Sequence, residues 1–224
     1  NFQNPTGITM SLAKRRRLYE LAVQHGVVII EDDPYGELRF KGEFLPAIKS
    51  FDTEGAVIYS GSFSKVLAPG IRVGYAVANR QLLSKMTVCK QTDDVHTGIF
   101  SQMLAYRFMK EYDFEAHLTK LRAIYRQKAE LAMCCARESF GNLVSFYPVE
   151  GGLFLWCRLP EQINMLEFCK KGIENGVAVV PGTAFLANEE AMTQCFRVNF
   201  STPSEEQIKT GFATLGNLVK EMLQ

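Results

Sequence analysis

Short apolar runs alternate with amphipathic segments over the first 140 residues, a pattern typical of an α/β fold. The runs that predict strands are 27–30, 56–60 and 73–77. The segments that predict helices are 12–25, 80–92, 94–111 and 113–139. The first run, Val27-Val28-Ile29-Ile30, contains no polar residue, so we expect a strand that is covered on both faces, as in a parallel sheet.

The third predicted strand returns along the second. Only 12 residues lie between the runs 56–60 and 73–77, and they contain Pro69-Gly70 but no amphipathic helix. A parallel pair needs a longer crossover connection, which is usually a helix. We therefore expect 73–77 to run antiparallel to 56–60.

The pattern changes after residue 140, where apolar runs follow one another across short turns. The predicted strands there are 144–148, 152–159, 177–180 and 195–200, and the predicted helices are 164–175 and 204–223. Short strands beside two helices are typical of a small α+β domain. We therefore expect part of a mainly parallel, three-layer α/β domain over 1–112. A small α+β domain over 113–224 follows and begins with the long linking helix.

The composition is that of an ordinary globular protein and narrows the choice of partners. Of 224 residues, 47% are hydrophobic and 22% are charged, and the net charge of +1 gives no reason to expect nucleic acid. The long apolar runs have strand length, so we expect no membrane span. The six cysteines form no CxxC pair, which indicates reduced, mostly buried thiols of a cytoplasmic protein.

Polar side chains gather where the predicted strands end. Asp32 and Tyr35 follow the first strand, Ser62 and Lys65 follow the second, and Arg72 stands where the third begins. Ligands of open α/β sheets bind beyond the carboxyl ends of the parallel strands. We therefore expect these five side chains to meet on one rim of the sheet.

Lys65 is the candidate for covalent chemistry. It lies among serines directly after an apolar strand, in Ser60-Gly61-Ser62-Phe63-Ser64-Lys65. A partly desolvated amine loses its proton more easily and then attacks a carbonyl carbon. The alternative, on this stretch alone, is a surface lysine in a Gly/Ser loop.

Several separated motifs together resemble the fold-type-I pyridoxal-phosphate enzymes, in particular the class I aminotransferases. These motifs are Asn4-Pro5-Thr6-Gly7, Asp32-x-x-Tyr35, Ser62-Phe63-Ser64-Lys65 with Arg72, Pro181-Gly182 and Phe196-Arg197-Val198-Asn199-Phe200. Two further stretches are similar to the 2-aminoadipate/kynurenine-type subgroup and to the aminotransferase-like domain of GntR/MocR-type regulators. They are Leu45-Pro46-Ala47-Ile48-Lys49-Ser50-Phe51-Asp52 and His117-Leu118-x-x-Leu121-Arg122-x-x-Tyr125.

The resemblance implies a role for each residue around the cofactor ring, pyridoxal 5'-phosphate. Lys65 is expected to form a Schiff base with the cofactor aldehyde and later to carry the substrate proton. Asp32 is expected to keep the pyridine nitrogen protonated, while Asp33 beside it is expected to be a surface turn residue. Tyr35 and Asn4 are expected to donate hydrogen bonds to the phenolic oxygen.

The remaining residues are expected to bind anions. Ser62, Ser64 and Arg72 suit the phosphate, because hydroxyl donors and a bidentate guanidinium match a dianion. The resemblance makes Arg197, with Asn4, the site of the substrate α-carboxylate. A buried salt bridge from Arg197 to an Asp or Glu is the alternative. His117 matches the subgroup pattern, and we expect it to be structural.

The function implied by the resemblance is transamination between an α-amino acid and a 2-oxo acid. The same site in a GntR/MocR-type regulator would sense an effector, and a lyase of the same fold would share the first steps. The chain begins with Asn1 and resembles the middle of a domain, so we expect a C-terminal fragment of a longer, homodimeric protein. Enzymes of this kind carry a glycine-rich phosphate loop and a ring-stacking aromatic before Asn-Pro-Thr-Gly.

Overall fold

The computed structural model describes residues 1–188 and 190–224. Contacts between residues divide the chain into two compact units. Unit 1 comprises Asn1 and Thr9–Leu121, and unit 2 comprises Phe2–Ile8 and Arg122–Gln224. How these units correspond to the domains of the whole protein stays a prediction, and each unit is described by itself.

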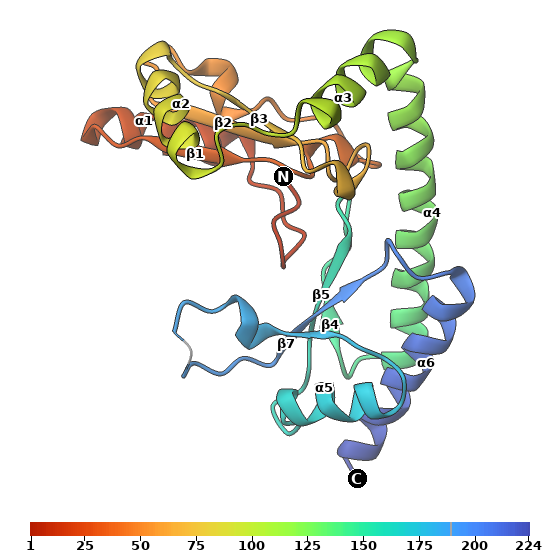
Figure 1. The fold of residues 1–224 in the computed structure, drawn as a ribbon. Coiled ribbons are helices and arrows are strands. Elements are labelled where there is room, and N and C mark those ends of the chain that lie inside the picture. The colour runs from red at the N-terminus through yellow and green to blue at the C-terminus, as the bar shows by residue number, and fades with distance from the viewer. Residues whose placement is uncertain (189) are drawn as a thin grey trace. The chain divides into compact units, whose positions relative to one another are not determined.

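Unit 1 contains a three-stranded sheet in the order β1-β2-β3 (Figure 1). Its strands are β1 (Ile29–Asp32), β2 (Val57–Ser62) and β3 (Gly74–Val77). β1 pairs with β2 in parallel, and β2 pairs with β3 in antiparallel orientation. The predicted return of the third strand is therefore confirmed.

The helices of unit 1 begin and end largely where the sequence predicts. They are α1 (Leu12–His25), α2 (Arg80–Asp93), α3 (Ile99–Glu111) and the first turns of α4 (Phe114–Phe140). The hydroxyl of Ser11 caps α1, and Gly26 ends it with a left-handed φ of 63° that a residue with a side chain rarely adopts. The prediction that a helix starts at 94 is wrong. Val95 has a φ of 65°, and the backbone becomes helical again only at Ile99.

Within the described residues, the first predicted strand is covered on one face only, whereas the sequence predicts cover on both. Val27 and Val28 precede β1 and are about half exposed, and Ile30 within the strand is 71% exposed. β1 is an edge strand whose residues alternate between a covered and an open face. On the covered face, the carboxylate of Glu31 accepts hydrogen bonds from the amides of Ile48 and Lys49 at 2.8 and 2.9 Å.

Unit 2 is a four-stranded antiparallel sheet with helices packed against it. The strand order is β4-β5-β7-β6. The strands are β4 (Ser145–Phe146), β5 (Phe154–Arg158), β6 (Val180–Pro181) and β7 (Cys195–Asn199), and the helices are α5 (Met165–Glu174), α6 (Glu205–Met222) and the remainder of α4. Of the predicted strand at 177–180, only Val180 lies in a strand, because β6 comprises Val180 and Pro181.

The core of unit 2 is built from aromatic rings that converge on β7. The ring of Phe196 is fully buried and lies 5.1 Å from the ring of Phe168 on α5 and 6.4 Å from that of Phe140 on α4. Phe212 on α6 completes the cluster, 5.7 Å from Phe140. Because side chains alternate along a strand, this burial directs the neighbouring Arg197 to the opposite face.

Two further expectations concern the state of the cysteines and the presence of a membrane-spanning helix. All six thiols are free, as predicted, but Cys89 on α2 and Cys134 on α4 are exposed rather than buried. Across residues 1–188 and 190–224, no helix has both the length and the apolar character needed to cross a bilayer.

Candidate functional site

Lys65 lies in a closed loop at the carboxyl end of β2. The amide of Phe63 donates to the carbonyl of Val73 at 3.0 Å, which joins the start of the loop to the approach to β3. The amide of Leu67 donates to the carbonyl of Phe63 at 2.8 Å, which closes a turn around Lys65. Lys65 is half-buried in this turn.

Arg72 folds back onto the same loop. Its Nη1 donates to the hydroxyl of Ser64 at 3.2 Å and to the carbonyl of Pro69 at 3.1 Å. The hydroxyl of Ser62 in turn accepts from the amide of Ser64 at 3.1 Å. The structure thus brings together the three residues predicted to hold a phosphate. Arg72 also has a left-handed φ of 52°, which costs a non-glycine residue about 1–3 kcal/mol.

Asp32 and the two serines of β2 share one face of the sheet. Asp32 pairs in register with Ser60, and Ser62 follows Ser60 at the two-residue period of a strand. The Asp32 carboxylate is exposed on this face. Its exposure leaves room for a cationic partner, and its pairing with a ring nitrogen stays a prediction.

Asp33 is not the surface turn residue that the sequence predicts. Its side chain is only 7% exposed, and it accepts a hydrogen bond from the hydroxyl of Tyr59 at 3.3 Å. Burial raises the pKa of Tyr59, and the adjacent Asp33 carboxylate raises it further. Tyr59 therefore stays protonated and donates to Asp33. Tyr35 follows at the head of a 3₁₀ turn and is 8% exposed.

A cavity of about 440 Å³ lies against the Lys65 loop on the side of these tyrosines. Phe63 and Val66 from the loop, Tyr59 and Tyr75 from the sheet, and Met109 from α3 contribute to its lining. Burial also raises the pKa of Tyr75. The cavity thus combines phenol and apolar side chains with the carboxylates of Asp33 and Glu37.

In unit 2, Arg197 is clamped between aromatic rings. Its guanidinium carbon lies 4.2 Å from the ring centre of Phe154 and 5.1 Å from that of Phe185. Trp156, the register partner of Arg197 on β5, meets Phe185 edge-on at 5.8 Å. Cation–π contacts of this kind involve the flat face of a guanidinium, whereas its N–H donors lie at the edge and make polar contacts.

One such polar contact joins Arg197 to Asn4. Nη1 of Arg197 donates to the amide oxygen of Asn4 at 2.6 Å, across 193 residues of sequence. The segment that carries Asn4 is anchored by Phe2, which is 1% exposed and packs against Gly151 and Gly152. Because Asn4 uses its oxygen here, its NH₂ group is the donor that the side chain offers to other partners.

Three residues around these sites were given no functional role from the sequence. Phe154 and Phe185 stack on Arg197, and Nε2 of His117 lies 2.7 Å from the carbonyl oxygen of Val66, beside Lys65. The strand pattern offered a signal for Phe154, because it lies two residues before Trp156 and so shares its face. The contact of His117 spans 51 residues, and no local pattern predicts it.

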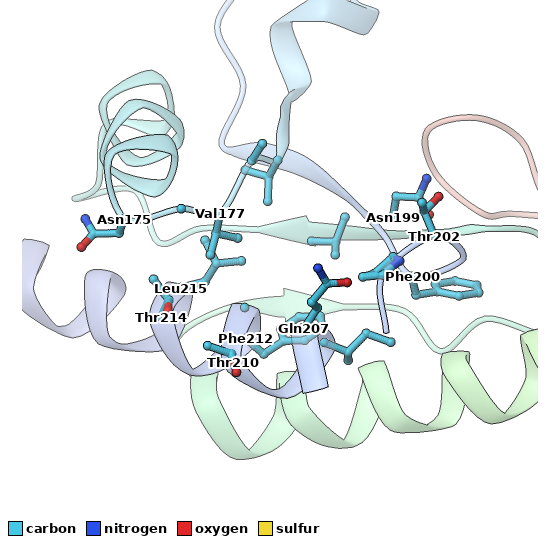
Figure 2. Close-up of a pocket in the computed structure, with 17 residues that line it drawn as sticks. Asn175, Val177, Asn199, Phe200, Thr202, Gln207, Thr210, Phe212, Thr214 and Leu215 are labelled. Carbon is cyan, nitrogen blue, oxygen red and sulfur yellow. The ribbon is translucent and has the colours of Figure 1, made fainter. Parts of the chain in front are cut away.

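Another cavity, of about 530 Å³, opens in unit 2 between α6, β7 and the segment 175–179 (Figure 2). Two of its polar side chains make structural hydrogen bonds. Asn199 accepts from the amide and hydroxyl of Ser201, and Gln207 forms a capping box with Ser204. None of the predicted site residues lines this cavity, so we do not include it in the candidate site.

The residues of unit 1 fit a phosphate-bearing aldehyde. A half-buried amine stands at the carboxyl end of a parallel strand, with two hydroxyls and a guanidinium gathered one turn away. An open carboxylate lies on the same face of the sheet as the hydroxyl of Ser62. These are the groups that pyridoxal phosphate needs for its aldehyde, its phosphate and its ring nitrogen.

Comparison with known proteins agrees with this geometry. The family model for "Aminotransferase class I and II" matches residues 1–215. Aromatic-amino-acid aminotransferase 1 of Thermococcus litoralis is 39% identical over 223 residues, which are 100% of this chain and 53% of that protein. The crystal structure of LysN, the α-aminoadipate aminotransferase of Thermus thermophilus, is complexed with N-(5'-phosphopyridoxyl)-L-leucine. It superposes with a TM-score of 0.94 at 37% identity, covering 99% of this chain and 57% of LysN.

The similarity extends to a regulator. The uncharacterized HTH-type transcriptional regulator YjiR of Escherichia coli is 32% identical, over 100% of this chain and 47% of that protein. The chain spans about half the length of the curated relatives that it matches.

Proposed function

The chain belongs to the class I and II aminotransferase family, and we propose that the whole protein transfers an amino group from an α-amino acid to a 2-oxo acid. The observation that carries this proposal is the Lys65 loop. It places a half-buried amine beside Ser64, whose hydroxyl contacts Arg72 at 3.2 Å. We propose pyridoxal 5'-phosphate as the cofactor, because the residues of unit 1 fit its three polar groups.

Lys65, Asp32 and Tyr35 of unit 1, with Asn4 of unit 2, would each hold one part of the cofactor. Lys65 would attach to the aldehyde and later move the proton at the substrate α-carbon. Asp32 keeps the ring nitrogen protonated, and Tyr35 with Asn4 donates to the phenolic oxygen. When bound, the cofactor supplies an electron-accepting ring for the electron pair that the α-carbon releases.

Ser62, Ser64 and Arg72 bind the phosphate. Arg72 provides a charge that does not titrate, and its planar fork suits two phosphate oxygens at once. The contact between Arg72 and Ser64 supports this assignment, because it holds the guanidinium beside the two hydroxyls before any anion arrives. Such preorganisation reduces the entropy that binding costs.

Arg197 and Asn4 bind the carboxylate of the amino acid. The rings of Phe154 and Phe185 fix the plane of the guanidinium, and Asn4 contacts its Nη1. A carboxylate that binds in this plane meets two parallel N–H donors.

We also propose that the whole protein is a cytoplasmic homodimer. Free thiols at all six cysteines support a reducing compartment. Apolar side chains exposed along α3, including Phe100 at 80% and Tyr106 at 56%, support a protein interface. Gel filtration with light scattering of the full-length protein tests the dimer, and a monomer at micromolar concentration contradicts it.

Reductive trapping tests the assignment of Lys65. The full-length protein is mixed with pyridoxal 5'-phosphate, borohydride makes any attachment permanent, and the modified peptide is identified by mass spectrometry. We expect the label on Lys65, and K65A should lose it while keeping its far-UV circular dichroism spectrum. Lys49 is the internal control, because its amine is held by Asp52 at 2.8 Å. A label spread over several lysines, or absent from Lys65, overturns the assignment.

The products of turnover separate the three related functions. With an amino acid and 2-oxoglutarate, an aminotransferase forms one new amino acid for each one consumed. Release of ammonia indicates a lyase instead. Label on Lys65 without any turnover, in a protein that also carries a DNA-binding module, indicates the regulator that the similarity to YjiR keeps as a second candidate.

A further inference from the structure

We propose that His117 is a positioning residue for Lys65. Its imidazole holds the main chain next to Lys65 and thereby fixes the direction in which the lysine leaves its loop. This inference rests on the proposed function, because it assigns His117 to the amine that attaches the cofactor.

The hydrogen bond between His117 and Val66 is short, and the chemistry of the two groups shows which one is the donor. Nε2 of His117 lies 2.7 Å from the carbonyl oxygen of Val66, the residue that follows Lys65. A carbonyl oxygen only accepts hydrogen bonds, so Nε2 carries the proton and donates it. The hydrogen bond reaches across 51 residues of sequence, from the first turns of α4 to the loop after β2.

The imidazole itself is held firmly. The ring of Phe108 meets it edge-on at 5.2 Å, and the ring of Phe114 stacks on it at 6.2 Å with an interplanar angle of 23°. The next residue, Leu118, is 1% exposed and fixes this turn of α4 in the core. The Asp113 carboxylate accepts from the amide of Ala116 at 2.9 Å and caps the helix start. The donor therefore stands on a rigid support.

The hydrogen bond completes a clamp on one peptide group. The amide of Leu67 donates to the carbonyl of Phe63, and the carbonyl of Val66 accepts from His117. These are the two ends of the same peptide unit, so its plane is held from both sides. The Val66 side chain is buried as well, at 7% exposure. Lys65 therefore has a fixed anchor on its downstream side, as the amide of Ser64 gives it on the upstream side.

Loss of the donor should loosen the loop without altering the chemistry of the amine. A buried carbonyl left without its partner destabilises the closed loop, so the loop opens more often. The Lys65 amine then spends less time in the orientation that meets the aldehyde. Its attachment should become slower, while the identity of the labelled residue stays the same.

Three variants of the full-length protein distinguish the effect of the His117 N–H donor from the effect of its aromatic ring. H117F keeps an aromatic ring between Phe108 and Phe114 but removes the donor. H117Q replaces the ring with an amide whose nitrogen reaches the place of Nε2. H96F is the matched control, because His96 is exposed and contacts only the local carbonyl of Thr97 at 3.0 Å among the contacts described for it.

The first readout is hydrogen exchange of the cofactor-free protein, followed by mass spectrometry of peptides covering 63–72. We expect H117F to exchange the amides of Leu67 and Ala68 about tenfold faster than the wild type. H117Q should restore most of the protection, and H96F should match the wild type. The second readout is the rate of borohydride-trapped attachment to Lys65, which should fall about tenfold in H117F and recover in H117Q.

The proposal fails if H117F exchanges and attaches like the wild type, or if H117Q is as defective as H117F. Should H117F not fold, H117N takes its place, because its shorter amide stops short of Val66. In that case, equal behaviour of H117N and H117Q overturns the proposal. If the wild type itself shows no label on Lys65, the proposed function fails, and the exchange experiment still decides whether His117 holds the loop.

Discussion

Two functional regions of this chain are held in place by different physical means. The Lys65 loop of unit 1 is fixed by hydrogen bonds of its own backbone and by polar side chains such as Ser62 and Arg72. Arg197 of unit 2 stands on a regular strand whose other face is buried, with Phe196 and Phe200 at 0% and 1% exposure. The loop is thus held by polar contacts and the strand by apolar burial.

This difference determines whether a substitution can change ligand binding without changing the stability of the fold. On β7 the alternation of side chains assigns Arg197 to one face and the core residues to the other, so a change at Arg197 should leave the core intact. In the loop, Arg72 contacts both Ser64 and the carbonyl of Pro69, so one residue serves the anion site and the backbone together. Substitutions in the two regions should therefore have different effects on binding and on stability.

The largest effect is expected for R197A. Loss of a charge-assisted pair of hydrogen bonds to the substrate carboxylate should raise the KM for the amino acid about 100-fold. Cofactor absorbance and the midpoint of urea unfolding should stay at their wild-type values, because the core face of β7 is untouched. Steady-state kinetics and urea denaturation of the full-length protein check both parts.

R197K is the matched control, because it keeps the charge and loses the planar fork. It should fall between the wild type and R197A in KM. If R197A instead unfolds at much lower urea and binds the amino acid normally, Arg197 belongs to a buried salt bridge, and the substrate role is wrong.

Sequence periodicity predicts the elements of both regions for a physical reason. Strand and helix positions follow from local alternation, caps and turns. The hydroxyl of Ser11, the left-handed Gly26 and the Ser204–Gln207 capping box are all visible in a few neighbouring residues. The antiparallel return of β3 followed from the length of one connection. The element boundaries of α1 and α6 were accordingly close to the observed ones.

Contacts between segments that are distant in the sequence could not be predicted from local patterns. Asp33 is buried because Tyr59, on the neighbouring strand, donates to it, and an acidic run after a strand gives no sign of this. The aromatic clamp on Arg197 depends on Phe185, twelve residues earlier, which a 3₁₀ turn directs toward it. The resemblance to a family supplied the candidate residues, whereas these supporting contacts became visible only in the folded chain.

A smaller effect on binding is expected for R72G. This substitution should lower the affinity for the cofactor but raise the stability of the backbone. Cofactor affinity should fall about 30-fold, because the phosphate loses a charged donor. The backbone conformation of the loop should become more stable, because glycine adopts the left-handed φ of 52° without steric cost. Fluorescence titration with the cofactor and urea unfolding of the cofactor-free protein measure the two parts.

R72A is the control for R72G, since it removes the same donor and keeps the strain. We expect R72G to be more stable than R72A by about 1 kcal/mol, with equal losses of cofactor affinity. A lower stability of R72G than of R72A would mean that the left-handed φ of residue 72 does not strain the loop.

The smallest effect, on stability, is expected for substitution of Asp52, whose carboxylate accepts hydrogen bonds at the start of β2. Its carboxylate is inaccessible to solvent and accepts from the amides of Ala56 and Val57 at 2.9 and 3.1 Å and from Lys49 Nζ at 2.8 Å, just where β2 starts. Burial raises the pKa of this carboxyl, but these hydrogen bonds outweigh burial, and the pKa lies below its ordinary value of 3.8.

A pKa that is lower in the folded state gives stability that is present above pH 3.8 and is lost as the pH falls through the folded value. D52N removes that contribution, so it should be less stable than the wild type by about 1 kcal/mol at pH 7. The difference should shrink below pH 4, which urea denaturation at pH 7, 5 and 3 measures. D94N is the control, because Asp94 forms an exposed pair with Lys90 and should behave like the wild type at every pH. A difference between D52N and the wild type that stays constant down to pH 3 would show that shape, and not charge, makes Asp52 important at the start of β2.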